Sequence, residues 1–383
     1  MTLTDILTRE DFRRHEFPVA CEKIFLAHAG VAPLPRRVSE AVRDYALACT
    51  RGDQETILPA RHLRRTRELA ARLLNATPEE IALVGPTSLA LSFIAAGLDL
   101  KKGDNVLVYQ DDYPSNVYPW MALSDRGVEV RFLNIREPGR IRLMDVIGQV
   151  DEQTRLVALA SCHFLSGYRI DLNAIGRALR QRNILFSVDA IQTLGAFPTT
   201  VEHIDFLAAD AHKWLLGPCA AGILYVRKEL TQRLHPIVFG WNNLRCPDYV
   251  AQDELIFRPD ARRYEAGTHN LLGVVGLHAA LETLLEIGID NIATELIRKR
   301  TSIITALQTR GYTVLHAAAP PENASSIVTF HRDDTNLAEL HNRLEAAGVI
   351  ASLRADRAGR KYLRLSPHFY NTDAELERCL QLL

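Results

Sequence analysis

The sequence predicts an α/β protein in which a mostly parallel, seven-stranded sheet lies between helices and is followed by a smaller α+β C-terminal domain. Seven apolar runs of strand length occur between about residues 81 and 226. Helical patterns separate most of them, which is typical of a parallel sheet covered on both faces. The 383 residues also exceed what one hydrophobic core usually serves. We therefore predict an N-terminal arm (1–17) that joins the small domain, a large domain (18–280) and a small domain (281–383).

The large domain is expected to begin with a brief strand at 23–26 and an irregular loop at 27–35. Two helices follow, one to about Cys49 and one to about Asn75. The predicted strands are 81–85, 106–109, 128–133, 156–161, 184–189, 204–209 and 222–226. The pattern leaves open whether the last strand runs antiparallel.

The small domain is introduced by a helical pattern from about Gly276 to Gln308, which predicts one long helix linking the domains. Strands are expected near Tyr312 and at 326–330, 349–353 and 362–366. A closing helix is expected from Thr372.

Composition excludes several classes of function. The net charge is −1, and no basic stripe with interleaved aromatic residues suggests a nucleic-acid partner. Six scattered cysteines lack metal-ligand spacing, so we expect no metal site and reduced, mostly buried thiols. The N-terminus is too charged for a signal peptide, and no apolar run is long enough to span a membrane. These observations predict a cytoplasmic protein.

The stretch Ile204 to Pro218, IDFLAADAHKWLLGP, presents one lysine, Lys213, among apolar residues. Loss of hydration disfavours an ammonium group and lowers its pKa. The neutral amine can form a Schiff base with a carbonyl compound or with pyridoxal 5'-phosphate (PLP). The alternative is a loop lysine whose stem packs on Trp214 while its charge reaches water. The stretch alone favours that alternative.

Three other predicted strand ends carry groups that suit a cofactor, because open parallel sheets bind ligands at this edge. Thr87 and Ser88 begin a helix, where they either bind a phosphate or simply cap the helix. Asp189 either holds a pyridine nitrogen protonated or caps a helix. Tyr113 either stacks on a planar ring or is a core aromatic residue.

These groups occur within an ordered series of motifs. The series is LVGPTS, DDYPSNVYPW, SGYRIDL, SVDAIQ, DFLAADAHKWLLGP, RRYEAGTHN and LRLSPHFYNT. From about Phe25 to the C-terminus the chain resembles the class V aminotransferases, fold-type-I PLP enzymes that include cysteine desulfurases and isopenicillin N epimerase-like proteins. The resemblance implies PLP as cofactor, a small amino acid as substrate, and a homodimer with sites at the subunit interface.

The resemblance also implies roles for individual residues. Lys213 resembles the Schiff-base lysine, preceded by His212, and Asp189 resembles the partner of the pyridinium nitrogen. The other implied cofactor ligands are Gln192 at the phenolic oxygen, Tyr113 stacked on the ring, Thr87 and Ser88 at the phosphate, and Thr268 at the phosphate of the neighbouring subunit. Arg364 matches the arginine that holds the substrate α-carboxylate, whereas the residues alone suggest a surface strand position.

Several positions depart from the family pattern. Asp210 replaces a common phosphate-binding serine, so we expect its carboxylate to point away from the phosphate or to pair with a cation. His163 stands near a usual asparagine and either touches the ligands or is a buried core histidine. The segment 353–362 contains no cysteine where desulfurases carry a persulfide-forming one. Substrate choice is expected to involve His28, Arg354 and Trp241.

The predicted reaction is transamination at the α-carbon of a small amino acid. The alternatives are a C–S lyase or desulfurase-like β-elimination, an epimerase, and a PLP-binding protein without turnover. A nucleotide-dependent oxidoreductase is disfavoured because the chain lacks a G-x-G-x-x-G turn.

Overall fold

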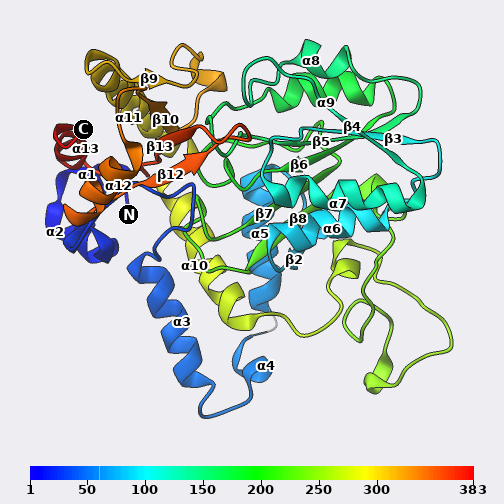
Figure 1. Cartoon of the computed structure of the whole chain (residues 1–383). Helices are drawn as coiled ribbons and strands as arrows, with labels where there is room; N and C mark the ends of the chain where they lie inside the picture. Colours follow the sequence, from blue (N-terminus) through cyan, green and yellow to red (C-terminus); the bar gives the residue numbers. More distant parts are fainter. Residues whose placement is uncertain (60) are drawn as a thin grey trace.

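A seven-stranded sheet forms the centre of the computed structural model, which describes residues 1–59 and 61–383 (Figure 1). Its strand order is β2-β8-β7-β6-β5-β3-β4. The strands are β2 (Ile81–Val84), β3 (Asn105–Val108), β4 (Glu129–Phe132), β5 (Thr154–Ala160), β6 (Leu185–Asp189), β7 (Phe206–Asp210) and β8 (Gly222–Val226). β8 pairs antiparallel with β2 and β7, and the other pairs are parallel. The predicted mostly parallel α/β fold is confirmed.

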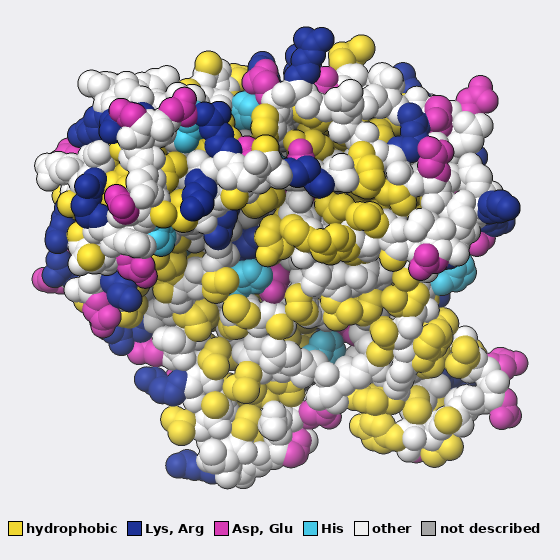
Figure 2. Space-filling model, in the orientation of Figure 1, with side chains coloured by type: hydrophobic (Ala, Val, Ile, Leu, Met, Phe, Trp, Pro, Cys, Tyr) yellow, Lys and Arg dark blue, Asp and Glu magenta, His cyan; other side chains and the backbone are white. Residues whose placement is uncertain are grey.

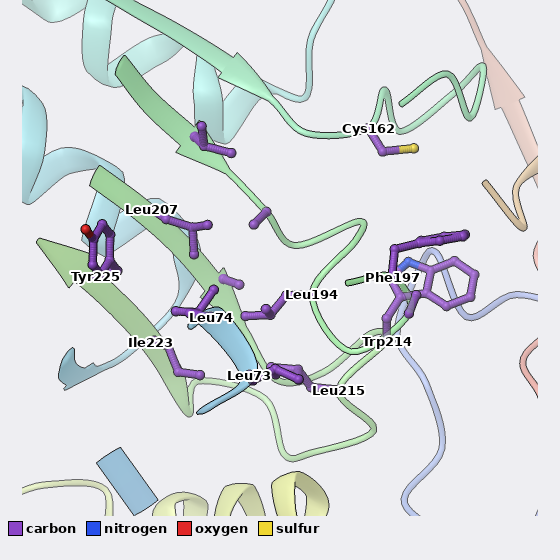
Figure 3. Close-up of a cluster of buried hydrophobic side chains, with 14 of the residues drawn as sticks. Leu73, Leu74, Cys162, Leu194, Phe197, Leu207, Trp214, Leu215, Ile223 and Tyr225 are labelled. Carbon is purple, nitrogen blue, oxygen red and sulfur yellow. The ribbon is translucent and has the colours of Figure 1, made fainter. Parts of the chain in front are cut away.

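Helices bury both faces of the sheet. Successive side chains of a strand point to opposite faces, so each strand contributes to two cores. On β7, Phe206 and Ala208 join the core under α6 (Thr87–Gly97) and α7 (Tyr118–Met121). Leu207 and Ala209 join the opposite core. There they meet side chains of α5 (Arg61–Leu74), α9 (Leu172–Arg180) and α10 (Leu271–Ile287). Figure 3 shows part of this second core, with side chains from β7, β8 and α5.

The small domain has its own sheet and core. An antiparallel sheet has the order β12-β13-β10-β9, and a parallel pair joins β1 to β11. These strands are β1 (Ile24–Phe25), β9 (Thr313–Val314), β10 (Val328–His331), β11 (Val349–Ile350), β12 (Ser352–Ala355) and β13 (Lys361–Leu365). The helices are α11 (Ile289–Thr309), α12 (Leu337–Ala346) and α13 (Asp373–Gln381).

The N-terminal helices α1 (Leu3–Thr8) and α2 (Glu10–Glu16) lie beside the C-terminal end of the chain (Figure 1). Buried Arg13 forms a 2.8 Å ion pair with Glu375, and the ring of Phe17 stacks on Tyr370 with centroids 4.2 Å apart. These contacts and the β1–β11 pairing join the first 25 residues to the small domain. The strand that was expected to begin the large domain therefore packs in the core of the small one.

The remaining helical segments are short or peripheral. The α-helices are α3 (Arg36–Ala48), α4 (Gln54–Ile57) and α8 (Leu143–Ile147). The 3-10 segments are η1 (Pro18–Cys21), η2 (Pro78–Glu80), η3 (Pro114–Asn116), η4 (Ala122–Arg126), η5 (Lys228–Leu230), η6 (Pro247–Tyr249), η7 (Ala261–Tyr264) and η8 (Pro321–Asn323).

Two expectations were wrong. The single helix predicted from Gly276 to Gln308 is two helices, α10 and α11, which meet at 78°. Gly288 between them has φ +89°, a conformation that glycine adopts without steric cost. The six cysteines are free, but just two of them, Cys162 and Cys379, are buried.

No single described helix has both the length and the apolar composition to cross a membrane. By those two criteria the bent pair α10–α11 would qualify together.

Candidate active site

A cavity of about 480 Å³ lies at the carboxyl edge of the large sheet, beneath the sheet of the small domain. We call it the lysine cavity. Its volume falls within the range of roughly 300–1,000 Å³ that is usual for small-molecule sites. The predicted site residues that line it are Thr87, Ser88, Tyr113, Asp189, Gln192, His212, Lys213, Arg354 and Arg364. They come together because β2, β3, β6 and β7 all end at the same edge of the sheet, while β12 and β13 approach from the small domain.

Lys213 follows β7 and is buried, with 7% of its surface exposed. Burial lowers the pKa of its amine to about 8, although the nearby Asp189 carboxylate acts in the opposite direction. The amine nitrogen lies 5.2 Å from the centroid of the Tyr113 ring. The loop after Lys213 holds two strained residues, Leu216 and Ala220, each with φ +57°. Lys213 is thus a desolvated amine at the start of a loop whose strained backbone is held by the surrounding structure, and it is not a solvated surface residue.

Asp189 ends β6 and is 2% exposed. Its Oδ1 accepts a 3.0 Å hydrogen bond from the backbone N–H of Ile191. Burial raises the pKa of its carboxyl to about 7, and the Asp112 carboxylate adds to the effect. A cation placed beside Asp189 would reverse this shift, since an opposite charge favours the ionised carboxylate. The position therefore suits a protonated ring nitrogen.

The N-terminus of α6 forms the end of the cavity that suits an anion. Thr87 is the first residue of this 11-residue helix, and its Oγ1 accepts a 2.8 Å hydrogen bond from the N–H of Asp210. Ser88 is exposed and also lines the cavity. Two hydroxyl groups and the positive end of the helix dipole favour a phosphate here.

Asp210 adjoins this end, but its carboxylate is fully engaged. It accepts hydrogen bonds from the N–H groups of Ala211, Ala220 and Ala221, at 2.8 to 3.1 Å. A fourth contact, at 2.8 Å, joins it to Nδ1 of His212. The carboxylate is thus held by three backbone N–H groups and the imidazole ring of His212.

Gln192 connects the cavity wall to the loop that carries Lys213. Its Nε2 donates to the carbonyl of Ala29 at 3.1 Å, and its Oε1 accepts from the indole N–H of Trp214 at 2.9 Å. Both ends of the amide are therefore fixed. The second hydrogen on Nε2 remains to serve an acceptor in the cavity.

Arg364 lies on β13 and is 1% exposed, so the surface position suggested by the residues alone was wrong. Its Nη1 donates to the carbonyl of Phe164 at 2.5 Å. Within the described chain, Nε and Nη2 are buried without a hydrogen-bond partner. Burial lowers the pKa of the guanidinium to about 9, and neighbouring Arg354 adds to this effect. Two free donors on one edge of the guanidinium fit a carboxylate.

Four predicted residues lie outside the lysine cavity. Both ring nitrogens of buried His28 are engaged, by the carbonyl of Ser366 and the hydroxyl of Tyr370. His163 likewise bonds to Ser166 and to the carbonyl of Asp111, which favours the core-histidine interpretation. Thr268 donates to Glu55 at 2.9 Å, and Trp241 packs against Tyr249. In this chain none of the four faces Lys213.

Two residues that contribute to the site were not predicted from the sequence, Asp112 and Phe164. Asp112 is buried, accepts a 2.8 Å hydrogen bond from the N–H of Tyr113, and raises the pKa of Asp189. Its position at the end of a predicted strand was a usable signal. Phe164 supplies a backbone carbonyl to Arg364, a role that no side-chain pattern reveals.

The residues present fit PLP. One cavity holds an amine, a carboxylate, a helix N-terminus that suits a phosphate, and a guanidinium with two free donors. No group of three or more His, Cys, Asp or Glu side chains within residues 1–59 and 61–383 forms a metal site.

Comparison with known proteins gives the same assignment. The family model for aminotransferase class V matches residues 24–379. A probable cysteine desulfurase of Methanothermobacter thermautotrophicus is 30% identical over 96% of this chain and 95% of that protein. An uncharacterized aminotransferase of Bacillus subtilis, YcbU, is 29% identical over the same shares. The apo structure of a cysteine desulfurase from Thermococcus onnurineus superposes with a TM-score of 0.88, at 23% identity over 97% of this chain and 96% of that one. The chain belongs to the aminotransferase class V family and is a PLP-dependent enzyme.

Proposed function

We propose that this enzyme removes the α-proton of an amino acid whose carboxylate is bound by Arg364, and then releases a sulfur leaving group from the β-carbon. One observation carries the proposal: a single cavity joins Lys213, Asp189 and the two free donors of Arg364. A base, an anchor for an electron-accepting ring and an anchor for a carboxylate are the parts that α-carbon chemistry requires.

Lys213 acts as the base. With a pKa near 8, a useful fraction of its amine is neutral at physiological pH, and the amine still binds a proton strongly enough to take it from carbon. Arg364 fixes the carboxylate, and its fork orients the α-carbon relative to the amine. PLP, when bound, supplies the electron sink that makes the α-proton acidic. Asp189 keeps the ring nitrogen protonated so that this sink stays effective.

Sulfur release is supported by the name of a relative, and release without an enzyme-bound persulfide is supported by the sequence of this chain. The Methanothermobacter relative is named a probable cysteine desulfurase. The β12–β13 segment, residues 353–362, contains no cysteine to take up the sulfur. We therefore favour β-elimination without an enzyme-bound persulfide. Lys213 takes the α-proton, the Cβ–S bond breaks with its electron pair on sulfur, and water completes the reaction. Cysteine plus water then gives pyruvate, ammonia and hydrogen sulfide, with no oxidant or reductant.

Transamination is the second candidate, supported by the B. subtilis relative that is named an aminotransferase. It would require the same base, Lys213, which would both take and return the proton, with PLP as the group that stores the amino nitrogen. Epimerisation and PLP binding without turnover use the same residues and remain predictions.

Product analysis separates these reactions. Purified holoenzyme is incubated with L-cysteine and, separately, with L-alanine and a keto acid. β-Elimination gives equal amounts of pyruvate, ammonia and sulfide from cysteine. Transamination gives pyruvate from alanine with no free ammonia, and it requires the keto acid. Loss of both activities in Lys213→Ala is expected. Sulfide release that survives this substitution would contradict the proposal.

We also propose a homodimer, supported by an exposed apolar lobe. Phe239, Tyr249 and Leu255 are 58%, 75% and 66% exposed in the segment 237–256. Figure 2 shows hydrophobic side chains gathered on this projecting lobe, and a gathering of exposed apolar side chains is typical of an interaction surface. Thr268 would reach a partner's phosphate after releasing Glu55. A cytoplasmic location also remains a prediction, supported by six free cysteines.

A further inference from the structure

A second cavity, of about 710 Å³, adjoins the lysine cavity. We call it the outer cavity. It lies between α7 and the turn that joins β12 to β13, and it includes Val117, Tyr118, Met121 and Leu165. Hydrophobic side chains gather between these two elements on the face shown in Figure 2. Half-buried Phe164 lines both cavities and forms part of the partition between them.

The guanidinium that lines the outer cavity is paired with a carboxylate, and the other carboxylates of its lining accept hydrogen bonds from within the protein. Arg357 forms an ion pair with Asp111 and donates to the carbonyl of Gln110 at 2.7 Å. The Asp112 carboxylate accepts three hydrogen bonds from within the large domain.

Asp356 and His163, which also line this cavity, have hydrogen-bond partners as well. Asp356 accepts from the Tyr362 hydroxyl at 2.9 Å and from the N–H of Arg360. His163 has both ring nitrogens bonded, and burial lowers its pKa to about 4, so its ring is neutral. These polar side chains are thus held by neighbours in the protein, whereas the apolar side chains of Val117, Met121 and Leu165 remain open to the cavity.

Phe164, which forms part of this partition, also holds Arg364, the residue proposed to bind the substrate carboxylate. The carbonyl of Phe164 accepts from Nη1 of Arg364, and its ring meets Tyr113 edge-on with centroids 5.5 Å apart. Phe164 and Arg364 both line the lysine cavity, so a carboxylate held at Arg364 shares this cavity with Phe164. The substituent on the α-carbon is then within reach of the outer cavity.

We propose that the outer cavity binds the side chain of the substrate, and that the preferred amino acids carry a large apolar side chain instead of the small one predicted from the sequence. This inference rests on the proposed function, because it requires an amino acid held at Arg364. For the sulfur-releasing reaction, the matching substrates are cysteines with an apolar group on sulfur.

Two stable cofactor conjugates test the inference without turnover. N-(5'-phosphopyridoxyl)-L-alanine and N-(5'-phosphopyridoxyl)-L-phenylalanine are titrated calorimetrically into full-length protein stripped of PLP. Burial of the benzyl group should make the phenylalanine conjugate bind about tenfold or more tightly. If neither conjugate binds, the proposed function itself fails. If both bind equally, the function stands and the inference is overturned.

Filling the outer cavity should abolish the preference. Met121→Trp and Ala355→Trp place a large ring into the cavity from opposite sides. We expect both to bring the ratio of the two dissociation constants to about one, while binding of the alanine conjugate stays unchanged and confirms the fold. Met144→Trp is the matched control, because Met144 is 72% exposed and does not line the cavity. A preference that persists in both filled variants would refute the assignment.

Discussion

Replacing Arg364 by methionine should stabilise the cofactor-free protein and at the same time impair its binding of amino acids. The guanidinium is 1% exposed, and Nε and Nη2 have no partner within the described chain. Its pKa is lowered from 12.5 to about 9, which corresponds to ~5 kcal/mol of unfavourable burial at ~1.4 kcal/mol per pKa unit. Loss of the hydrogen bond to Phe164 costs ~1–3 kcal/mol. The net expectation is a gain of ~2–4 kcal/mol, the usual sign when a buried charge is replaced by an apolar group.

The binding penalty follows from the same geometry. Two charge-assisted hydrogen bonds to a carboxylate contribute ~1.5–3 kcal/mol each. Their removal should weaken amino acid binding by a factor of at least ~100. Chemical denaturation of the cofactor-free protein and amino acid titration of the holoenzyme measure the two effects.

Arg64→Met is the matched control, because Arg64 lines neither cavity and its exposed ion pair with Glu68 contributes at most ~1 kcal/mol. A destabilised Arg364→Met protein, or one that binds amino acids normally, would refute the view of Arg364 as an unsatisfied carboxylate anchor.

Three further outcomes are expected. The rate at which cofactor-free protein takes up PLP should rise with pH around a midpoint near 8, because the neutral amine of Lys213 is the nucleophile. Stopped-flow spectra measure this rate, and a midpoint near the ordinary lysine pKa of 10.5 would contradict the prediction. Asp189→Asn should match the cofactor-free wild type in stability at about pH 4 and exceed it at about pH 8. Burial raises the pKa of Asp189 to about 7 in the folded protein, against 3.8 in the unfolded chain. The protonated carboxyl group therefore contributes fully to the free energy of unfolding below pH 3.8, and this contribution is lost as the pH rises through 7. With PLP bound, the same substitution should lower the melting temperature instead. Finally, Tyr249→Asp combined with Leu255→Asp should yield monomers in analytical ultracentrifugation, whereas Tyr118→Asp, equally exposed but remote from the lobe, should leave the dimer intact.

Some features of the site could be predicted from the sequence, because they depend on the residues next to them in the chain. The run that ends at Asp189 is a buried strand by composition, and a carboxylate at its end requires a partner. Lys213 was recognised as a candidate because its neighbours are apolar. The break between α10 and α11 was missed, because an apolar helical pattern continues across Gly288 and only the backbone angle records the turn.

The sequence alone determined the alternation of strands and helices, the apolar surroundings of Lys213 and the absence of a cysteine at 353–362, because these depend on neighbours in the chain. Only the tertiary structure decided that Arg364 is buried with two free donors, that His28 and His163 are already bonded elsewhere, and that an apolar cavity adjoins Phe164. Each of these depends on segments up to several hundred residues apart. Burial and hydrogen-bond satisfaction arise when the two domains close on one another, and no local pattern encodes that contact.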